Sequence, residues 1–160
     1  MKFLQTIIAF FGRLCLSLIF LSSGIHKLLD WSGAKQTLIN ALGDLQTISL
    51  SGGEWSQVFL DFACPYVPEL LGVSVAFEIL GGLLILLGIQ VRFGAFLLIA
   101  FLIPATLLFH NFWVLESPER DLQMLNFMKN MGILGGLLLL LAYGKGLKVK
   151  KGNDKPAEKG

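Results

Sequence analysis

Three charged side chains lie inside long apolar segments of this 160-residue sequence: Arg13, Glu78 and Lys129. A charge at the centre of a membrane-spanning helix costs about 2.5–3.5 kcal/mol on insertion scales, so it needs a partner or a function. Counted from the expected cytoplasmic ends at about 1.5 Å per residue, Arg13 lies about 13 Å deep, Glu78 about 15 Å and Lys129 about 21 Å. The matched depths predict a salt bridge between Arg13 and Glu78, with Lys129 roughly one helical turn beyond it.

At about 100° per residue, each of these charges shares a helix face with small or polar side chains. The stripe in the first apolar segment consists of Arg13, Ser17, Phe20, Gly24 and Lys27. The glycines on the three charged faces, which would let helices approach closely, are Gly24, Gly81, Gly82, Gly132 and Gly136. We therefore expect the charges to point into a helix bundle and these glycines to mark helix contacts.

The charge count suggests a binding site. Arg13 and Lys129 are opposed by one carboxylate, that of Glu78. Either Lys129 is partly neutral, or an anionic or strongly hydrogen-bond-accepting ligand completes the cluster. The structural alternative is that Glu78 bridges both cations and locks the helices together, because a buried ion pair is weak support for function. His110, near the end of the third apolar segment, is either an interfacial anchor or a proton-transfer group.

The elements that position these residues are four apolar segments, at about 4–25, 67–89, 91–110 and 123–143. Each is close to the roughly 20 residues that a helix needs to cross a bilayer. The chain is 54% hydrophobic and 15% charged, whereas soluble domains carry roughly 25% charged residues. The sequence therefore predicts an all-α, integral membrane four-helix bundle that forms one domain over residues 1–144.

Basic residues predict the orientation of the bundle. Lys2, the basic connection 90–92 and the lysine-rich segment 145–160 are expected in the cytoplasm, with 145–160 forming a disordered tail. The external segment 26–66 would hold two short amphipathic helices on the membrane surface, or else an irregular loop. A cleaved signal peptide is the alternative for the first segment, but a charge interrupts it and no A-x-A site follows.

Several functional classes find no support in the sequence. Cys15 and Cys64 form no CxxC pair and have no ligand-spaced partner, which argues against a thiol–disulfide centre and a metal site. No P-loop or dinucleotide fingerprint is present. The C-terminal lysines lack the motif context of a nucleic-acid-binding surface, so we expect the lipid bilayer, not nucleic acid, as their partner.

The ordered motifs resemble those of the DoxX family of small four-helix membrane proteins. The matching stretches are Arg13 to Phe20, Ser23-Gly24 with Lys27, Glu78 with Gly81-Gly82 and Gly88, Phe109 to Trp113, and Phe127 to Asn130 with Gly132 and Gly135-Gly136. The resemblance implies a bacterial inner-membrane protein. Some relatives are subunits of thiosulfate:quinone oxidoreductases, and related proteins act as cargo receptors or assembly factors. The motif positions that the resemblance marks as site residues are Arg13, Glu78, His110, Lys129 and Asn130.

Three functions are compatible with these features. The first is a subunit of a redox-linked membrane complex that binds a quinone or a small anionic ligand at the charged cluster. Because the chain has no cofactor motif, it would act as an oxidoreductase only together with a redox protein partner. The second is a non-catalytic scaffold or assembly factor that recruits a partner protein. The third is a transporter, which would need an oligomer, and glycine-rich faces would permit a homodimer.

Overall fold

The computed structural model describes residues 2–49, 58 and 61–144, and all regular structure in these residues is helical. Four helices are long and apolar enough to cross a membrane. They are α1 (Lys2–Leu29), α4 (Val67–Leu87), α5 (Val91–Phe109) and α6 (Glu119–Tyr143). Helix α2 (Trp31–Ser49) follows α1, and short 3-10 helices precede α4 (η1, Cys64–Tyr66) and α6 (η2, Phe112–Val114). The predicted all-α membrane bundle is confirmed.

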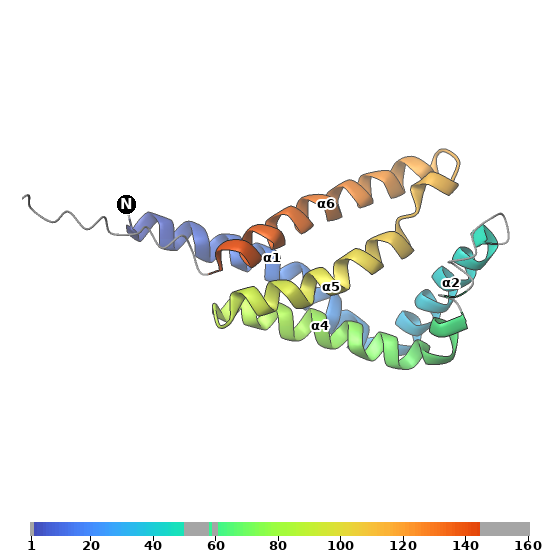
Figure 1. The fold of residues 1–160 in the computed structure, drawn as a ribbon, viewed down its shortest axis with the longest axis horizontal. Helices are drawn as coiled ribbons and strands as arrows, with labels where there is room; N and C mark the ends of the chain where they lie inside the picture. Colours follow the sequence, from blue (N-terminus) through green and yellow to red (C-terminus); the bar gives the residue numbers. More distant parts are fainter. Residues whose placement is uncertain (1, 50–57, 59–60, 145–160) are drawn as a thin grey trace, which may run out of the picture.

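The four long helices follow the expected spans closely, with two informative differences. Helices α4 and α5 begin at the predicted residues, Val67 and Val91. Helix α1 continues past the predicted end at residue 25 to Leu29, and α6 begins before residue 123, at Glu119. Both extensions lengthen the end of the bundle that lies opposite the N-terminus (Figure 1). As a result, residues assigned from sequence to the external connections become part of the helices.

The long helices pack as a series of antiparallel neighbours. Helix α1 lies along α4, α4 along α5, and α5 along α6 (Figure 1). The main core cluster, between α1, α4, α5 and α6, consists of Phe20, Ile85, Val91, Ala95, Leu98, Leu102 and Leu137. Most of the apolar surface of α1 and α6 stays exposed. This exposure is expected of helices that face lipid, because lipid tails solvate apolar side chains.

Two glycine positions make the α4–α5 hairpin. Gly88 ends α4 in the left-handed conformation, with φ of 69°, and its N–H bonds to the carbonyl of Ile85. Glycine adopts this conformation without steric cost, so the chain can turn directly into α5. Further along, a Cβ on Gly81 would lie 3.0 Å from the carbonyl oxygen of Gly94, so the two backbones meet there. This close contact fixes the rotation of α4 against α5.

Helix α2 packs against the bundle. Leu42 forms a small buried cluster with Ala63 and Val67, which lie just before and at the start of α4. Asp30 accepts a hydrogen bond from the N–H of Gly33, a typical cap for the first turn of α2. A helix is therefore present where the first of the two expected surface helices was predicted. The second falls mostly outside the described residues, and so does the C-terminal segment 145–160.

Candidate ligand-binding site

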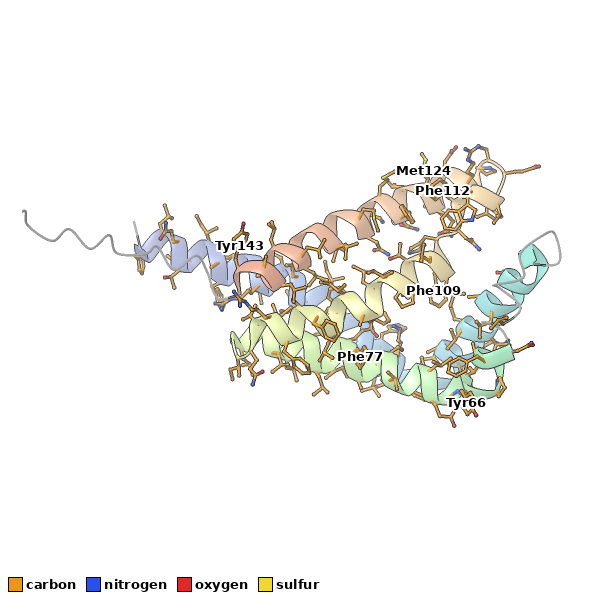
Figure 2. All side chains as sticks on the ribbon, viewed as in Figure 1. Tyr66, Phe77, Phe109, Phe112, Met124 and Tyr143 are labelled. Atoms are coloured by element: carbon orange, nitrogen blue, oxygen red, sulfur yellow. The ribbon has the colours of Figure 1, made fainter. Side chains whose placement is uncertain are left out.

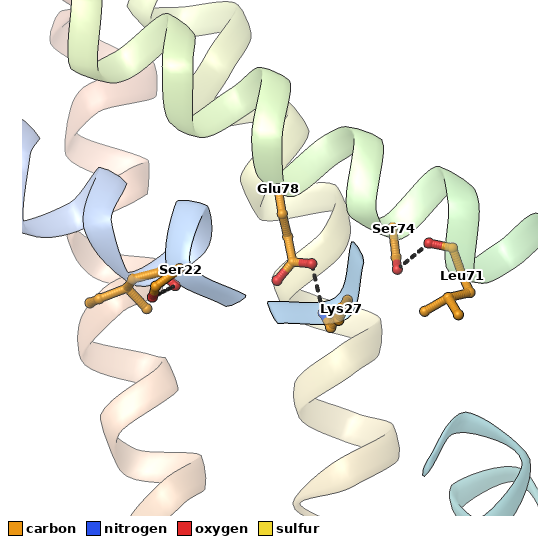
Figure 3. Close-up of polar contacts among 6 residues, drawn as sticks. Ser22, Lys27, Leu71, Ser74 and Glu78 are labelled. Carbon is orange, nitrogen blue, oxygen red and sulfur yellow. Dashed lines mark hydrogen bonds and ion pairs between the residues drawn. The ribbon is translucent and has the colours of Figure 1, made fainter. Parts of the chain in front are cut away.

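A buried ion pair joins α1 to α4. Glu78, in the middle of α4, is fully buried, and its Oε2 accepts a hydrogen bond from Lys27 Nζ at 2.6 Å (Figure 3). Lys27 lies near the end of α1, and its side chain is 26% exposed. The ammonium group also lies 4.6 Å from the centre of the Phe101 ring on α5. A cation over an aromatic face is attracted by the ring's negative face, so three helices hold this lysine.

The second carboxylate oxygen of Glu78 is not engaged in this way. Oε1 is buried and has no hydrogen-bond partner among the described residues. An ionised carboxylate can accept several hydrogen bonds, and leaving such a group unsatisfied in an apolar interior is costly. Glu78 therefore retains hydrogen-bonding capacity for a donor that comes from outside the polypeptide.

Glu78 lines a cavity of about 370 Å³ between α1, α4, α5 and α6. Its polar lining residues are Ser23, Lys27, Glu78, His110 and Asn130. Its aromatic lining residues are Phe20, Phe101 and Phe109. Ligand pockets commonly combine apolar and aromatic walls with a few placed polar groups, and their volumes start at about 300 Å³. We call this the Glu78 cavity.

Two hydrogen bonds fix the polar groups on the far wall of the Glu78 cavity. Asn130 Nδ2 donates to Thr106 Oγ1 at 3.0 Å, which joins α6 to the buried face of α5. His110 Nδ1 lies 2.8 Å from Gln123 Oε1. An amide oxygen only accepts hydrogen bonds, so His110 Nδ1 is the donor in this contact. The cavity thus offers both donors and acceptors.

The predicted salt bridge between Arg13 and Glu78 is wrong. The Arg13 guanidinium lies against Gly88, where a Cβ would come within 2.6 Å of Nη1. Gly88 is ten residues from Glu78 on the same chain segment, or about 15 Å along the helix axis. The carboxyl-terminal end of a helix attracts cations, which explains why Arg13 lies at the end of α4. Lys27 is the cation that pairs with Glu78.

The expectation that Lys129 points into the bundle is also wrong. Lys129 is exposed on α6, whereas the next residue, Asn130, is half-buried and bonded to α5. Adjacent residues on a helix are rotated by about 100°, so only one of the two can face α5. The same rotation leaves Gly132 in open space, because a Cβ added there would meet no described atom within 4 Å, while Gly136 contacts Leu16 on α1.

The other three glycines predicted to mark helix contacts, Gly24, Gly81 and Gly82, do lie where helices meet. A Cβ on Gly24 would lie 2.9 Å from Ile79, and one on Gly82 would lie 2.9 Å from Leu21, so both positions belong to the α1–α4 contact. Gly81 lies at the α4–α5 contact described above. These close approaches bring α1 near enough to α4 for Lys27 to reach Glu78.

Sequence reasoning missed Lys27 as a site residue, although a signal was present. Lys27 falls on the same helical stripe as Arg13 and Gly24, but the expected span ends at residue 25 and leaves it outside the membrane segment. Gln123 was also missed, because it is an uncharged side chain at the first residue of the expected fourth span and gives no signal of its own. Phe101 carries no signal in the sequence, since one phenylalanine among many apolar residues does not stand out.

The charge balance differs from the sequence-based count. At the site, one cation, Lys27, is paired with one anion, Glu78. Arg13 and Lys129 lie elsewhere. Cys15 and Cys64 are free and exposed, and among residues 2–49, 58 and 61–144 no three acidic, histidine or cysteine residues are grouped as metal ligands. The site that the geometry offers is a neutral, partly aromatic cavity with hydrogen-bonding groups.

Comparisons with known proteins agree with the membrane fold. The model of the DoxX family matches residues 8–111, which is more than half of the chain. Inner membrane protein YphA of Escherichia coli (strain K12) is 24% identical over 142 residues, covering 89% of this chain and 86% of that protein. Surfeit locus protein 4 homolog of Schizosaccharomyces pombe is 34% identical over 65 residues, covering 39% of this chain and 22% of that protein. No solved structure matches the chain.

Proposed function

Because this chain belongs to the DoxX family, we propose that it is a subunit of a redox-linked membrane complex and binds a quinone headgroup in the Glu78 cavity. The observation that carries the proposal is the Oε1 atom of Glu78, which is buried, lacks a partner among the described residues and belongs to a residue that lines a cavity. The sequence-based resemblance to quinone oxidoreductase subunits supports the same ligand class.

The chemistry of the cavity suits both redox forms of a quinone. A quinone presents carbonyl oxygens, which can accept hydrogen bonds from Lys27 or Asn130. A hydroquinone presents hydroxyl groups, which can donate to Glu78 Oε1. The rings of Phe101 and Phe109 line the same cavity and can pack against the flat headgroup. A site with donors and acceptors therefore accommodates either form.

The charge of the site favours a neutral headgroup over a small anion. An anionic ligand would be expected if Arg13 and Lys129 added a surplus positive charge beside Glu78. Among the described residues, the ion pair at the site is Lys27 with Glu78, so no net positive charge attracts an anion there. Burying an anion beside a neutral pair would carry its full desolvation cost.

The redox role requires a partner. Interconversion of a quinone and a hydroquinone moves two electrons and two protons. In this proposal Glu78 Oε1 exchanges a proton with a headgroup hydroxyl, and His110, which also lines the cavity, is the second proton-transfer group. The sequence contains no cofactor motif that would carry the electrons. We therefore assign electron transfer to a redox protein that associates with this chain in the bacterial inner membrane. The relative YphA is an inner membrane protein.

The proposal is tested by measuring quinol binding to the detergent-purified protein under reducing conditions. A hydroquinone with a single isoprene unit should bind to the wild type, and Glu78→Gln should weaken its binding about tenfold, the effect of losing one charge-assisted hydrogen bond. Lys129→Met is the matched control, because it removes an exposed charge on the same bundle, and it should bind like the wild type. Equal binding to wild type and Glu78→Gln would remove Glu78 from the site and leave a structural ion pair.

A scaffold or assembly factor is the second candidate. A specific observation favours it: Lys129 is exposed within α6, and a Cβ added to Gly132, one turn further along, would meet no described atom within 4 Å. A partner helix could approach closely there and satisfy the lysine. Cross-linking from position 132 in membranes would capture such a partner, and a failure to recover any reproducible partner would argue against this function.

A further inference from the structure

A second, more apolar opening lies beside the Glu78 cavity. It is a half-open cleft of about 460 Å³, bounded by the end of α1, by α2, by the first half of α4 and by the second half of α5. Its walls include Leu38 and Leu42 on α2, Leu70 and Phe77 on α4, and Phe101 and Leu108 on α5. We call it the α2 cleft. The labelled Phe77 marks its α4 wall in Figure 2.

The two openings share part of their lining. Lys27, Phe101, Ala105 and Phe109 line both the Glu78 cavity and the α2 cleft. Lys27 Nζ, which bonds to Glu78 and lies over the Phe101 ring, is therefore at the junction of the two. A molecule with its polar end beside Glu78 can continue past these shared residues into the apolar cleft.

Helix α2 is held in place at two points, and the cleft lies between them. Its first turn is capped by Asp30, and Leu42 packs in the small cluster with Ala63 and Val67. Three of the residues that line the cleft are small: Ala34 on α2, with Ala100 and Ala105 on α5. Small side chains on both walls leave volume that larger residues would fill.

The α2 cleft is lined mostly by apolar side chains, and two of its polar side chains are already engaged within their own helices. Thr37 Oγ1 donates to the carbonyl of Gly33, and Ser74 Oγ donates to the carbonyl of Leu71. Asp30 accepts from the N–H of Gly33. The charged and titratable side chains, His26, Lys27 and Asp30, lie together at the end of α1, so the rest of the cleft offers few of the two to four polar partners that a held water needs. The cleft is therefore suited to an apolar occupant.

We propose that the α2 cleft holds the isoprenoid tail of the quinone whose headgroup lies beside Glu78. This inference rests on the proposed function and specifies its substrate class as a long-tailed, membrane-resident quinone. Lipid tails are as apolar as the cleft walls, so the tail gains little affinity by leaving the bilayer. The cleft instead orients the molecule, because a tail that lies along α2 keeps the headgroup at the shared residues beside Glu78.

The experiment locates the tail by photocross-linking. The full-length protein, in phosphatidylcholine nanodiscs, is irradiated with a quinone that carries a diazirine on its third isoprene unit, and the cross-links are mapped by mass spectrometry. The label should attach to α2 and to the second half of α5, and excess unlabelled quinone should compete. Ala34→Phe should lower the yield on α2 about tenfold, because the ring fills the cleft. Ala76→Phe, at an exposed position on α4, should leave the yield unchanged.

The outcomes separate this inference from the proposed function. A second quinone probe carries the diazirine on the headgroup. If this probe attaches near Asn130 in both the wild type and Ala34→Phe, the headgroup site does not depend on the cleft. If the tail label spreads evenly over lipid-facing residues while the headgroup label stays near Asn130, the tail assignment is overturned and the proposed headgroup site stands. A photoreactive phosphatidylcholine that labels α2 without competition from quinone would also overturn it. If Ala34→Phe fails to fold, Ala100→Phe fills the opposite wall and serves the same test.

Discussion

At the scale of single residues, the central feature is a carboxylate with two different oxygens. One oxygen of Glu78 is bonded to Lys27, and the other is buried without a partner among the described residues. A purely structural ion pair would be expected to satisfy both oxygens, because a buried polar group without a partner destabilises the fold. A ligand at the proposed site would give the second oxygen a partner, which helix register alone does not.

Removing one member of the ion pair should destabilise the fold, because the other member is left charged and buried. Removing both members together should cost much less. Lys27→Met leaves the Glu78 carboxylate unpaired, and we expect the free energy of unfolding to fall by about 3 kcal/mol, the low end for a buried pair, since Lys27 is partly exposed. The double variant Lys27→Met/Glu78→Leu removes both charges and should recover most of that loss. Denaturant titration in mixed micelles measures the effect, with Lys129→Met as the control. Additive losses in the double variant would show that the two side chains are not coupled.

At the scale of elements, the sequence predicts the helices well and their rotation poorly. Apolar length determines that α1, α4, α5 and α6 exist, because a bilayer requires about 20 apolar residues. Hydropathy does not determine which of two adjacent polar residues faces inward. Lys129 and Asn130 illustrate this: packing on α5 turns Asn130 inward and Lys129 outward. The sequence predicts the burial of Glu78 but not its partner, because the predicted end of α1 falls four residues too early.

Helix contacts can be tested with two glycines that the sequence did not distinguish. A Cβ on Gly81 would lie 2.8 Å from Leu98, in a contact where the α4 and α5 backbones also meet, whereas one on Gly132 would meet no described atom within 4 Å. We expect Gly81→Ala to lower the free energy of unfolding by about 1–3 kcal/mol through overpacking. Gly132→Ala should change it little or raise it slightly, because alanine favours the helix. Thermal unfolding of both variants in one detergent compares them, and an equal loss would contradict the assigned rotation of α6.

At the scale of the whole molecule, two arginines lie at the same end of the bundle. Arg13 lies against Gly88 at the end of α4, and Arg92 Nη2 donates to the carbonyl of Ala142 near the end of α6 at 2.9 Å. Both helix ends carry partial negative charge, which the guanidinium groups offset. The N-terminus belongs to this same end (Figure 1). Positive residues concentrate on the cytoplasmic side of membrane proteins, so this end is proposed to face the cytoplasm.

Orientation can be measured with single cysteines in the two short connections of the bundle. Gln90 lies in the connection between α4 and α5, and Ser117 lies in the connection between α5 and α6. With Cys15 and Cys64 replaced by alanine, we expect Ser117→Cys to react with a membrane-impermeant maleimide in intact spheroplasts. Gln90→Cys should react only after lysis, because the basic end that includes Arg92 stays in the cytoplasm. The two positions are exposed alike, so each serves as the other's control. The Glu78 cavity lies nearer the Ser117 end of α5 and α6. The reverse labelling pattern would therefore place the cavity in the cytoplasmic half of the membrane. The redox partner would then have to approach from the cytoplasm.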